Sequence, residues 1–362
     1  MITIKLLSHV FFVLLLLNLS ACSEDSPTQS ESDFWNEVDE LITSNVNPNG
    51  SGYGLLVVKD GVIAFSKGWG MSNIANNIQF TADTPLNIAS LTKQFTACAI
   101  LILYERNELG LHDNILTYLP ELPAEWSGVT IHHLLTHQSG IPDYVGLLGD
   151  WNTYDGLTNQ QALQMVIDDG GLEFTPGTNI SYSNTAYIIL AMLVERISRT
   201  SYPQFMEENI FNPLQMTSTF VMHEYANVPS TAAVSYSDSN QPYNYDLFTY
   251  GAGNIYSTLN DMYKWDQALY TEQIISQESF QLAITDYTGG DNNYGYGWMT
   301  GSHYGYPAHR HGGYSFGNLN FIIRVPDRHI TYLMLSNGGV FANNGFDTWT
   351  TEVQDMIFDY YF

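Results

Sequence analysis

The chain has 362 residues, of which 44% are hydrophobic, 14% aromatic and 13% charged. This balance predicts a globular protein and excludes a disordered one, and the length suits one large domain or two smaller ones. There are 37 acidic and 11 basic residues, and the formal net charge of -26 disfavours binding to nucleic acid and to anionic lipid head groups.

Residues 1–21 have the pattern of a signal peptide, with Lys5 before an apolar run that is too short for a comfortable transmembrane helix. The run ends in Leu19-Ser20-Ala21-Cys22, which resembles a bacterial lipobox, in which the cysteine is lipidated. We therefore expect an exported lipoprotein, held at the periplasmic face or the cell surface of the bacterial envelope by a lipid on Cys22. Residues 22–33 would form a flexible polar tether. An ordinary signal peptide with a chance cysteine is the alternative.

Apolar spacing predicts a helix over 33–44, and β-rich runs predict strands over 53–59 and 62–67. Asp60-Gly61, between the two runs, suits the tight turn of a β-hairpin. Helical periodicity predicts further helices over 89–109, 131–137, 159–169, 185–200 and 260–270.

Near the C-terminus, β-rich runs over 318–325 and 329–336 predict a second hairpin, followed by a helix over 347–361. Strands thus lie at both ends of the chain and helices fill the middle. We expect an α/β fold of the α+β kind, with one antiparallel sheet built from both chain ends, flanked by helices, and a largely helical inserted region. The domain would span 34–362, with a sheet region over 34–88 and 290–362 and a helical region over 89–289.

Ser90-Leu91-Thr92-Lys93 is the first element that suggests chemistry. A serine and a lysine three residues apart share one face of a helix and can touch. Serine is a weak nucleophile until a base takes its proton, and a neutral, buried lysine can be that base. No other lysine in the chain has a serine three residues before it, although a chance match is the alternative.

Tyr182-Ser183-Asn184 lies before the predicted helix 185–200. A tyrosine on a loop can carry protons between a nucleophile and a leaving group, and Asn184 can bind a substrate amide or Lys93. A loop tyrosine followed by a helix-capping asparagine is the plainer interpretation.

His311-Gly312-Gly313 comes shortly before the predicted strand 318–325. Glycines on an edge strand allow a substrate backbone to approach closely, and a simple turn is the alternative.

The order and spacing of these three elements resemble the serine β-lactamase and penicillin-binding-protein superfamily, which has S-x-x-K and K-T-G elements. The Y-x-N form of the middle element looks closest to the class C β-lactamase branch. Stretches that also resemble the family, within a similarity that covers roughly 34–362, are 132–140, 174–177, 252–257 and 294–298.

The resemblance implies a β-lactamase/transpeptidase-like fold and a role for each motif position. Ser90 would be the nucleophile, Lys93 the base or its partner, and Tyr182 the proton shuttle. Asn184 would orient the substrate, and the His311–Gly313 strand would bind it. The backbone N–H groups of Ser90 and Tyr314 would form the oxyanion hole. The sequence leaves open which of Lys93 and Tyr182 accepts the first proton.

His311 departs from the family pattern, because it stands where K-T-G has its lysine. In β-lactamases that lysine helps to hold the substrate carboxylate, whereas a histidine is often neutral at pH 7. Capture of a carboxylate should therefore weaken, which argues against a strong β-lactamase.

Two other patterns point to different chemistry. Gly313-Tyr314-Ser315-Phe316-Gly317 matches the G-x-S-x-G nucleophile elbow, but a strand-like run follows it where the elbow needs a helix. His133 with His137, and His309 with His311, have spacings that could serve a metal, but no H-E-x-x-H is present and we expect no metal site.

We therefore expect a serine hydrolase that cleaves a small-molecule ester, amide or peptide through an acyl-enzyme on Ser90, without a cofactor. β-Lactamase or D,D-peptidase activity is the alternative. A metal-dependent hydrolase and a non-catalytic penicillin-binding sensor are the remaining hypotheses.

Overall fold

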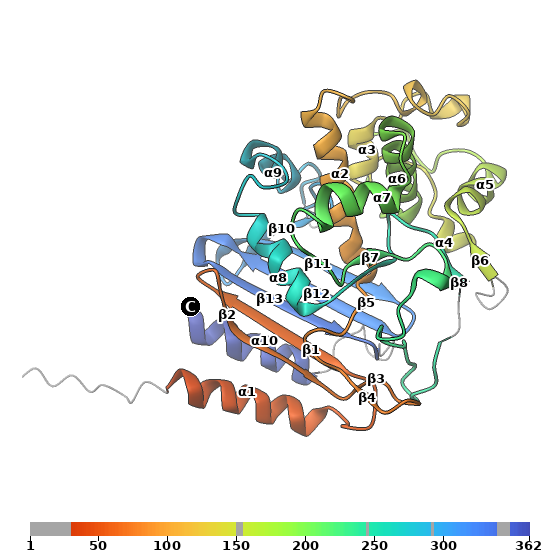
Figure 1. Ribbon diagram of the computed structural model, residues 1–362. Helices are drawn as coiled ribbons and strands as arrows, with labels where there is room; N and C mark the ends of the chain where they lie inside the picture. Colours follow the sequence, from red (N-terminus) through yellow and green to blue (C-terminus); the bar gives the residue numbers. More distant parts are fainter. Residues whose placement is uncertain (1–29, 150–154, 244–245, 291–292, 339–347) are drawn as a thin grey trace, which may run out of the picture.

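The computed structural model describes residues 30–149, 155–243, 246–290, 293–338 and 348–362. The expected signal peptide, Cys22 and most of the tether lie outside these ranges. Figure 1 shows three layers, namely a pair of helices, a central sheet and a larger helical region. Within the described ranges, no helix combines the length and the apolar character needed to span a bilayer.

A six-stranded antiparallel sheet forms the middle layer, in the order β10-β11-β12-β13-β1-β2. Its strands are β1 (Tyr53–Lys59), β2 (Val62–Trp69), β10 (Met299–His303), β11 (Tyr306–Ser315), β12 (Asn318–Val325) and β13 (Ile330–Ser336). β1 pairs with β13, so the two ends of the chain meet inside the sheet (Figure 1). The prediction of one antiparallel sheet built from both chain ends is confirmed.

Both predicted hairpins are present. Asp60 and Gly61 join β1 to β2 with φ values of 51° and 78°, which are left-handed values suited to a tight turn. β12 and β13 are joined by a 3₁₀ turn over Pro326–Arg328 and by His329, whose φ is 47°. Because His329 is left-handed, β13 begins at Ile330, one residue later than predicted.

Helices α1 (Glu31–Asn45) and α10 (Thr348–Tyr361) cover one face of the sheet (Figure 1). Successive side chains of β1 point to opposite faces of the sheet. Leu55 and Val57 belong to the core beneath α1 and α10, whereas Leu56 and Val58 belong to the core beneath the helical region.

The start of α1 corrects the predicted tether. Ser30 caps the helix, because its Oγ accepts the N–H of Asp33 at 3.1 Å. The helix therefore includes residues 31 and 32, which were expected to belong to the tether, and begins two residues before its predicted start at 33.

The helical region is built around α2 (Thr92–Glu105) and α6 (Asn184–Ser198), most of whose side chains are buried. Around them lie α3 (Ile131–Leu135), α4 (Tyr144–Leu147), α5 (Asn159–Asp169), α7 (Tyr202–Met206), α8 (Leu259–Ala268) and α9 (Gln277–Ala283). The helix predicted over 89–109 is shorter than expected. It opens with a 3₁₀ turn (Ala89–Leu91) because the φ of Ala89 is 49°, and the α-helix ends at Glu105, just before left-handed Asn107.

Several strands of two or three residues were not predicted, because they are too short to show periodicity. They are β3 (Met71–Asn73) with β4 (Ile78–Gln79), β6 (Asp155–Leu157) with β8 (Asp246–Leu247), and the three-stranded order β5 (Leu86–Asn87), β9 (Ile255–Ser257) and β7 (Phe220–Val221). The last of these small sheets leads directly into the turn that carries Ser90.

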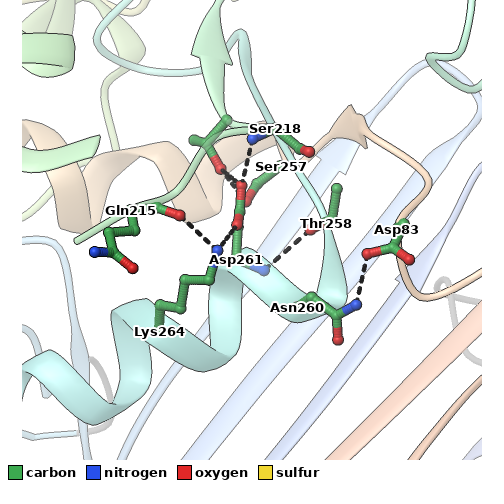
Figure 2. Close-up of polar contacts among 9 residues, drawn as sticks. Asp83, Gln215, Ser218, Ser257, Thr258, Asn260, Asp261 and Lys264 are labelled. Carbon is green, nitrogen blue, oxygen red and sulfur yellow. Dashed lines mark hydrogen bonds and ion pairs between the residues drawn. The ribbon is translucent and has the colours of Figure 1, made fainter. Parts of the chain in front are cut away.

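A buried polar network holds this small sheet against the start of α8 (Figure 2). Asp261, only 2% exposed, accepts the N–H of Ser218 at 2.8 Å and the hydroxyl of Thr219 at 2.9 Å. Lys264 donates to Asp261 at 2.8 Å, and Ser257 at the end of β9 lies 2.8 Å from the Thr219 hydroxyl. The network thus ties the segment before β7 to the end of β9, which pairs with β5 just before Ser90.

Candidate active site

Ser90 lies in the 3₁₀ turn that precedes α2, and Lys93 lies one turn further on. The turn is held in place because the N–H of Ala89 donates to Oδ1 of Asn87 at 2.8 Å. The Lys93 amine donates to Oγ of Ser90 at 3.0 Å. The contact expected from the S-x-x-K spacing is therefore present.

Lys93 is completely buried, which is unusual for a lysine. Its amine also donates to Oδ1 of Asn184 and to the carbonyl of Ala252, both at 2.8 Å. Burial lowers the pKa of Lys93 to about 7, although the negative charge of Asp143 acts in the opposite direction. A substantial fraction of this amine is thus neutral at pH 7, as a general base must be.

Tyr182 lies beside the Ser90–Lys93 pair, with its ring centroid 4.8 Å from the Lys93 amine. The residue is 39% exposed, and its hydroxyl is hydrogen-bonded with Ser90. Burial raises the pKa of Tyr182 above its usual value, and hydrogen bonding with Ser90 lowers it by less. Tyr182 is accordingly a neutral hydroxyl at pH 7, able to relay a proton.

Asn184 faces Lys93 on one side and Asp143 on the other. Its Oδ1 accepts from Lys93, while its Nδ2 donates to Oδ2 of Asp143 at 2.9 Å and its backbone N–H donates to Oδ1 at 3.0 Å. Sequence reasoning missed Asp143, because no helix or motif was predicted around it. Asp143 caps α4, and it also places a negative charge near Lys93.

His311 is 1% exposed and does not present a charge to the site. Its Nδ1 lies 2.6 Å from the carbonyl of Gly312, and its Nε2 lies 2.9 Å from the hydroxyl of Tyr294. Since a carbonyl only accepts, Nδ1 carries the proton and Nε2 accepts from Tyr294. Burial and the nearby Lys93 lower the pKa of His311 to about 3, so this histidine is neutral at pH 7.

Gly313 has a role different from the one expected. A Cβ at Gly313 would lie 2.3 Å from the carbonyl oxygen of Ile88, so the glycine lets β11 pack against the Ser90 turn. At Gly312 the nearest atom to an added Cβ is 3.8 Å away. Of the two glycines it is Gly312 that lines the pocket, and Gly313 supports the pocket from behind.

The edge-strand prediction for this segment is correct in part. β10 pairs with β11 only from Tyr306 to Arg310, so His311–Ser315 extend beyond the end of β10. This half of β11 borders a cavity of about 590 Å³, to which Ser90, Tyr182, Asn184, His311 and Tyr314 all contribute. The cavity thus brings together all the predicted catalytic and substrate-binding residues except two, Gly313 and the buried Lys93.

Ser315 also lines this cavity, but its surroundings are those of a hairpin. β11 ends at Ser315 and β12 begins at Asn318, with those two residues paired across the turn. A strand follows, and no helix, so the match to the nucleophile elbow is coincidental, as predicted.

His133 and His137, two of the histidines whose spacing suggested a metal, have other partners, and so has the neighbouring His132. His133 completes a capping box with Thr130 at the start of α3, and His132 lies 2.9 Å from the hydroxyl of Tyr296. His137 packs against Tyr182, with ring centroids 4.3 Å apart. Across the described ranges, no group of three or more His, Cys, Asp and Glu side chains is arranged to hold a metal ion.

Comparison with known proteins places this geometry in a family. The family model described as Beta-lactamase matches residues 38–354. Penicillin-binding protein 4* of Bacillus subtilis is 31% identical over 78% of this chain, and D-aminopeptidase of Gluconobacter oxydans is 25% identical over 80%. The chain spans 67% and 56% of the length of these two relatives.

Solved structures give the same fold. The octameric penicillin-binding protein homologue from Pyrococcus abyssi superposes with a TM-score of 0.78, covering 91% of this chain and 78% of that one. At 23% identity, this likeness establishes the fold alone. The match of the Beta-lactamase family model over 38–354 shows that the chain belongs to the β-lactamase family of serine hydrolases.

Proposed function

We propose that the protein hydrolyses an ester or amide through an acyl-enzyme on Ser90, with Lys93 as the general base and Tyr182 as the proton relay. One observation carries the proposal. The Ser90 hydroxyl lies 3.0 Å from the amine of a fully buried lysine whose pKa burial lowers to about 7. An ordinary surface lysine would be protonated at pH 7 and could not accept the serine proton.

Acylation begins when neutral Lys93 takes the proton of the Ser90 hydroxyl and Oγ bonds to the acyl carbon. The carbonyl electrons move to oxygen and form a tetrahedral anion. As the bond to the leaving group breaks, the Tyr182 hydroxyl gives that group a proton and receives one from protonated Lys93. This half-reaction yields acyl-Ser90 and a free alcohol or amine, with Lys93 neutral again.

Deacylation uses water in place of the serine hydroxyl. Lys93 receives a proton from water through Tyr182 as the water oxygen bonds to the acyl carbon. Ser90 Oγ then leaves with the proton, which releases a carboxylic acid and restores the enzyme. The backbone N–H groups of Ser90 and Tyr314 are our candidates for holding the anion in both steps, and such a donor lowers the barrier by about 3–4 kcal/mol.

Lys93 is favoured over Tyr182 as the first base because burial acts on them in opposite ways. It lowers the pKa of the lysine towards neutrality, whereas it raises the pKa of the tyrosine and keeps the phenol protonated. A protonated phenol can pass a proton on, but it cannot take the first one.

Esters, amides and short peptides are the candidate substrates. A D-aminopeptidase among the relatives favours amide cleavage, and a penicillin-binding protein favours the D,D-peptidase or β-lactamase alternative. The neutral state of His311 weighs against strong β-lactam turnover, because a penicillin carries a carboxylate.

The proposal is tested by steady-state hydrolysis of a neutral activated ester. Ser90→Ala should abolish turnover with an unchanged circular dichroism spectrum. Ser315→Ala, the matched control for a serine in the same cavity, should keep most of it. Full activity of Ser90→Ala, or loss of activity only in Ser315→Ala, would refute the assignment.

We further propose that the mature protein is held to the cell envelope by a lipid on Cys22. The support is the sequence alone, in which a short apolar run ends in Leu19-Ser20-Ala21-Cys22.

A further inference from the structure

Among the residues that the structure describes, no lysine or arginine lines the cavity beside Ser90, so none there could bind an anionic substrate. From this, and resting on the proposed function, we infer that the site acts on acyl donors without a free carboxylate, namely neutral esters or amides that present an apolar group.

The chain has so few basic residues that the position of each can be stated. The sequence has 11 lysines and arginines, and apart from Lys5 all of them lie in the described ranges. None lines the cavity. Four of them form ion pairs elsewhere on the molecule: Lys59 with Asp60, Lys67 with Asp39, Arg196 with Glu121, and Lys264 with Asp261. A fifth, Arg106, donates to Asn209.

The remaining cations are also placed away from the substrate. Arg324 is buried against Asp266 at 2.6 Å, and Arg328 donates to the carbonyl of Tyr361. Arg199 caps the far end of α6. Arg310 lies two residues after Ala308 on β11 and therefore on the same face of the sheet, the one covered by α1 and α10, which is opposite to the face of His311.

In the described part of the chain, Lys93 is the one lysine or arginine at the site, and its amine is fully hydrogen-bonded. Its three hydrogen bonds go to Ser90, Asn184 and Ala252, so it has no N–H left for a carboxylate. If Lys93 is to serve as the base, it must also be neutral at the moment of attack.

The polar groups best placed to hold a substrate are satisfied within the protein. Both nitrogens of His311 are hydrogen-bonded, one to Gly312 and one to Tyr294. The Asn184 amide uses its oxygen for Lys93 and a nitrogen donor for Asp143. A carboxylate entering here would lose its hydration without gaining a charged partner, which is unfavourable.

The rest of the cavity wall suits an apolar group. Val145, Leu247, Met299 and Phe316 line it, together with the rings of Tyr144 and Tyr314. A cavity of about 590 Å³ is large enough for a substrate with a ring or a short alkyl chain. The formal net charge of -26 adds a long-range repulsion that acts against anions approaching from solution.

The test compares two esters that differ in one charge, the phenylacetate esters of 3-hydroxybenzoate and of 3-hydroxybenzamide. After correction for their rates of uncatalysed hydrolysis, the neutral carboxamide should have at least a tenfold higher kcat/KM. The preference should persist in 0.5 M NaCl, since salt screens the distant surface charges but not the cavity. Equal or better turnover of the carboxylate ester, or a preference that vanishes in salt, would overturn the inference.

Variants at His311 sharpen the comparison. His311→Lys should narrow the preference by improving the carboxylate ester, whereas the neutral control His311→Gln should keep it. The wild-type comparison decides the question if either variant fails to fold. Failure of the inference is distinct from failure of the proposed function, because only the latter predicts that Ser90→Ala still hydrolyses both esters.

An independent observation concerns His137, which holds the segment around Tyr182 from both sides. The N–H of Ser181 donates to the His137 carbonyl at 3.0 Å, and the N–H of Ser183 donates to its Nδ1 at 3.1 Å. The imidazole ring lies against the ring of Tyr182, with centroids 4.3 Å apart. We propose that His137 is a positioning residue that sets the place of the Tyr182 hydroxyl.

His137 itself is rigidly held. It is 1% exposed and has a left-handed φ of 60°, a conformation that asparagine tolerates better than most residues. His137→Asn therefore keeps the backbone and a hydrogen-bond acceptor while removing the ring. This variant should lower kcat at least tenfold with KM within about twofold, as small displacements of a reacting group are costly.

A double-mutant cycle with Tyr182→Phe separates positioning from general destabilisation. If His137 acts through Tyr182, the double variant should be no slower than Tyr182→Phe alone, because the positioned hydroxyl is already missing. Effects on kcat that multiply in the double variant would overturn the proposal.

Discussion

Replacing Asp143 with asparagine isolates the influence of one negative charge on the general base. The Asn184 amide connects Asp143 to Lys93, because its nitrogen donates to Asp143 at 2.9 Å and its oxygen accepts from Lys93 at 2.8 Å. The Asp143 charge raises the pKa of Lys93 against the larger effect of burial. Asp143→Asn should therefore lower the pKa of Lys93 from about 7.

The size of the effect follows from the geometry. The Asn184 amide separates the two charges, and at an effective dielectric constant of about 20 two unit charges on either side of one such group interact by about 2 kcal/mol. Because Asp143 is partly exposed, we discount this to roughly one pKa unit. The substitution also removes an acceptor for the Asn184 amide. An amide turned to compensate would offer an N–H to Lys93, which again favours the neutral amine.

The assay is the pH dependence of acylation by a neutral ester between pH 5 and 9. Activity should fall as pH drops through the pKa of Lys93, because protonation removes the base. In Asp143→Asn this acid limb should move down by roughly one pH unit, so the variant is several-fold faster than the wild type near pH 6. Asp168→Asn, an exposed site on α5, controls for the change in net charge. An acid limb that stays in place or moves up would refute the role given to Lys93.

Three further predictions follow from the packing and the sequence. Gly313→Ala places a Cβ 2.3 Å from the Ile88 carbonyl oxygen and should shift the Ser90 turn, which should lower kcat/KM for the ester by about 100-fold. In the control Gly312→Ala the nearest atom is 3.8 Å from the added Cβ, so kcat/KM should fall far less, and equal losses in the two variants would contradict the packing role of Gly313. Asp266→Ala leaves Arg324 buried without its partner and should lower the free energy of unfolding by about 3–5 kcal/mol in urea denaturation, and a change below about 1 kcal/mol would be inconsistent with a buried ion pair. Cys22→Ala in the full chain should move the protein from the membrane fraction to the soluble fraction after export, and unchanged membrane association would exclude the lipid on Cys22.

The parts of the fold that could be predicted from the sequence are those with a strong local pattern. The Asp60-Gly61 hairpin and helix α5 were located correctly because turn chemistry and helical periodicity act over a few residues. Helix ends were less accurate. Helix α3 stops at Leu135, two residues before left-handed His137, and the sequence gives little warning of a left-handed histidine.

The same division holds for the site. The Ser90–Lys93 contact follows from a three-residue spacing on one helical turn. The contacts of Lys93 with Asn184, and of Asn184 with Asp143, join segments 91 and 41 residues apart, so no local pattern predicts them. The protonation state of His311 depends on its burial and on the hydrogen bond with Tyr294. The strong lowering of its pKa could therefore not be predicted without the fold.

Gly313 shows why a motif does not by itself define a role. Its place in the His311-Gly312-Gly313 stretch suggested contact with a substrate, but the space its missing side chain leaves is filled by the Ile88 carbonyl. The strand packs against the nucleophile turn there, and the substrate-facing position is Gly312.

The most direct test of the proposed mechanism is intact-mass spectrometry of the purified protein after brief exposure to a neutral activated ester. The mechanism predicts one acyl adduct per chain, absent in Ser90→Ala, retained in Ser315→Ala, and formed more slowly below pH 7 as Lys93 becomes protonated. An adduct that persists in Ser90→Ala, or that disappears only in Ser315→Ala, would show that Ser90 is not the nucleophile.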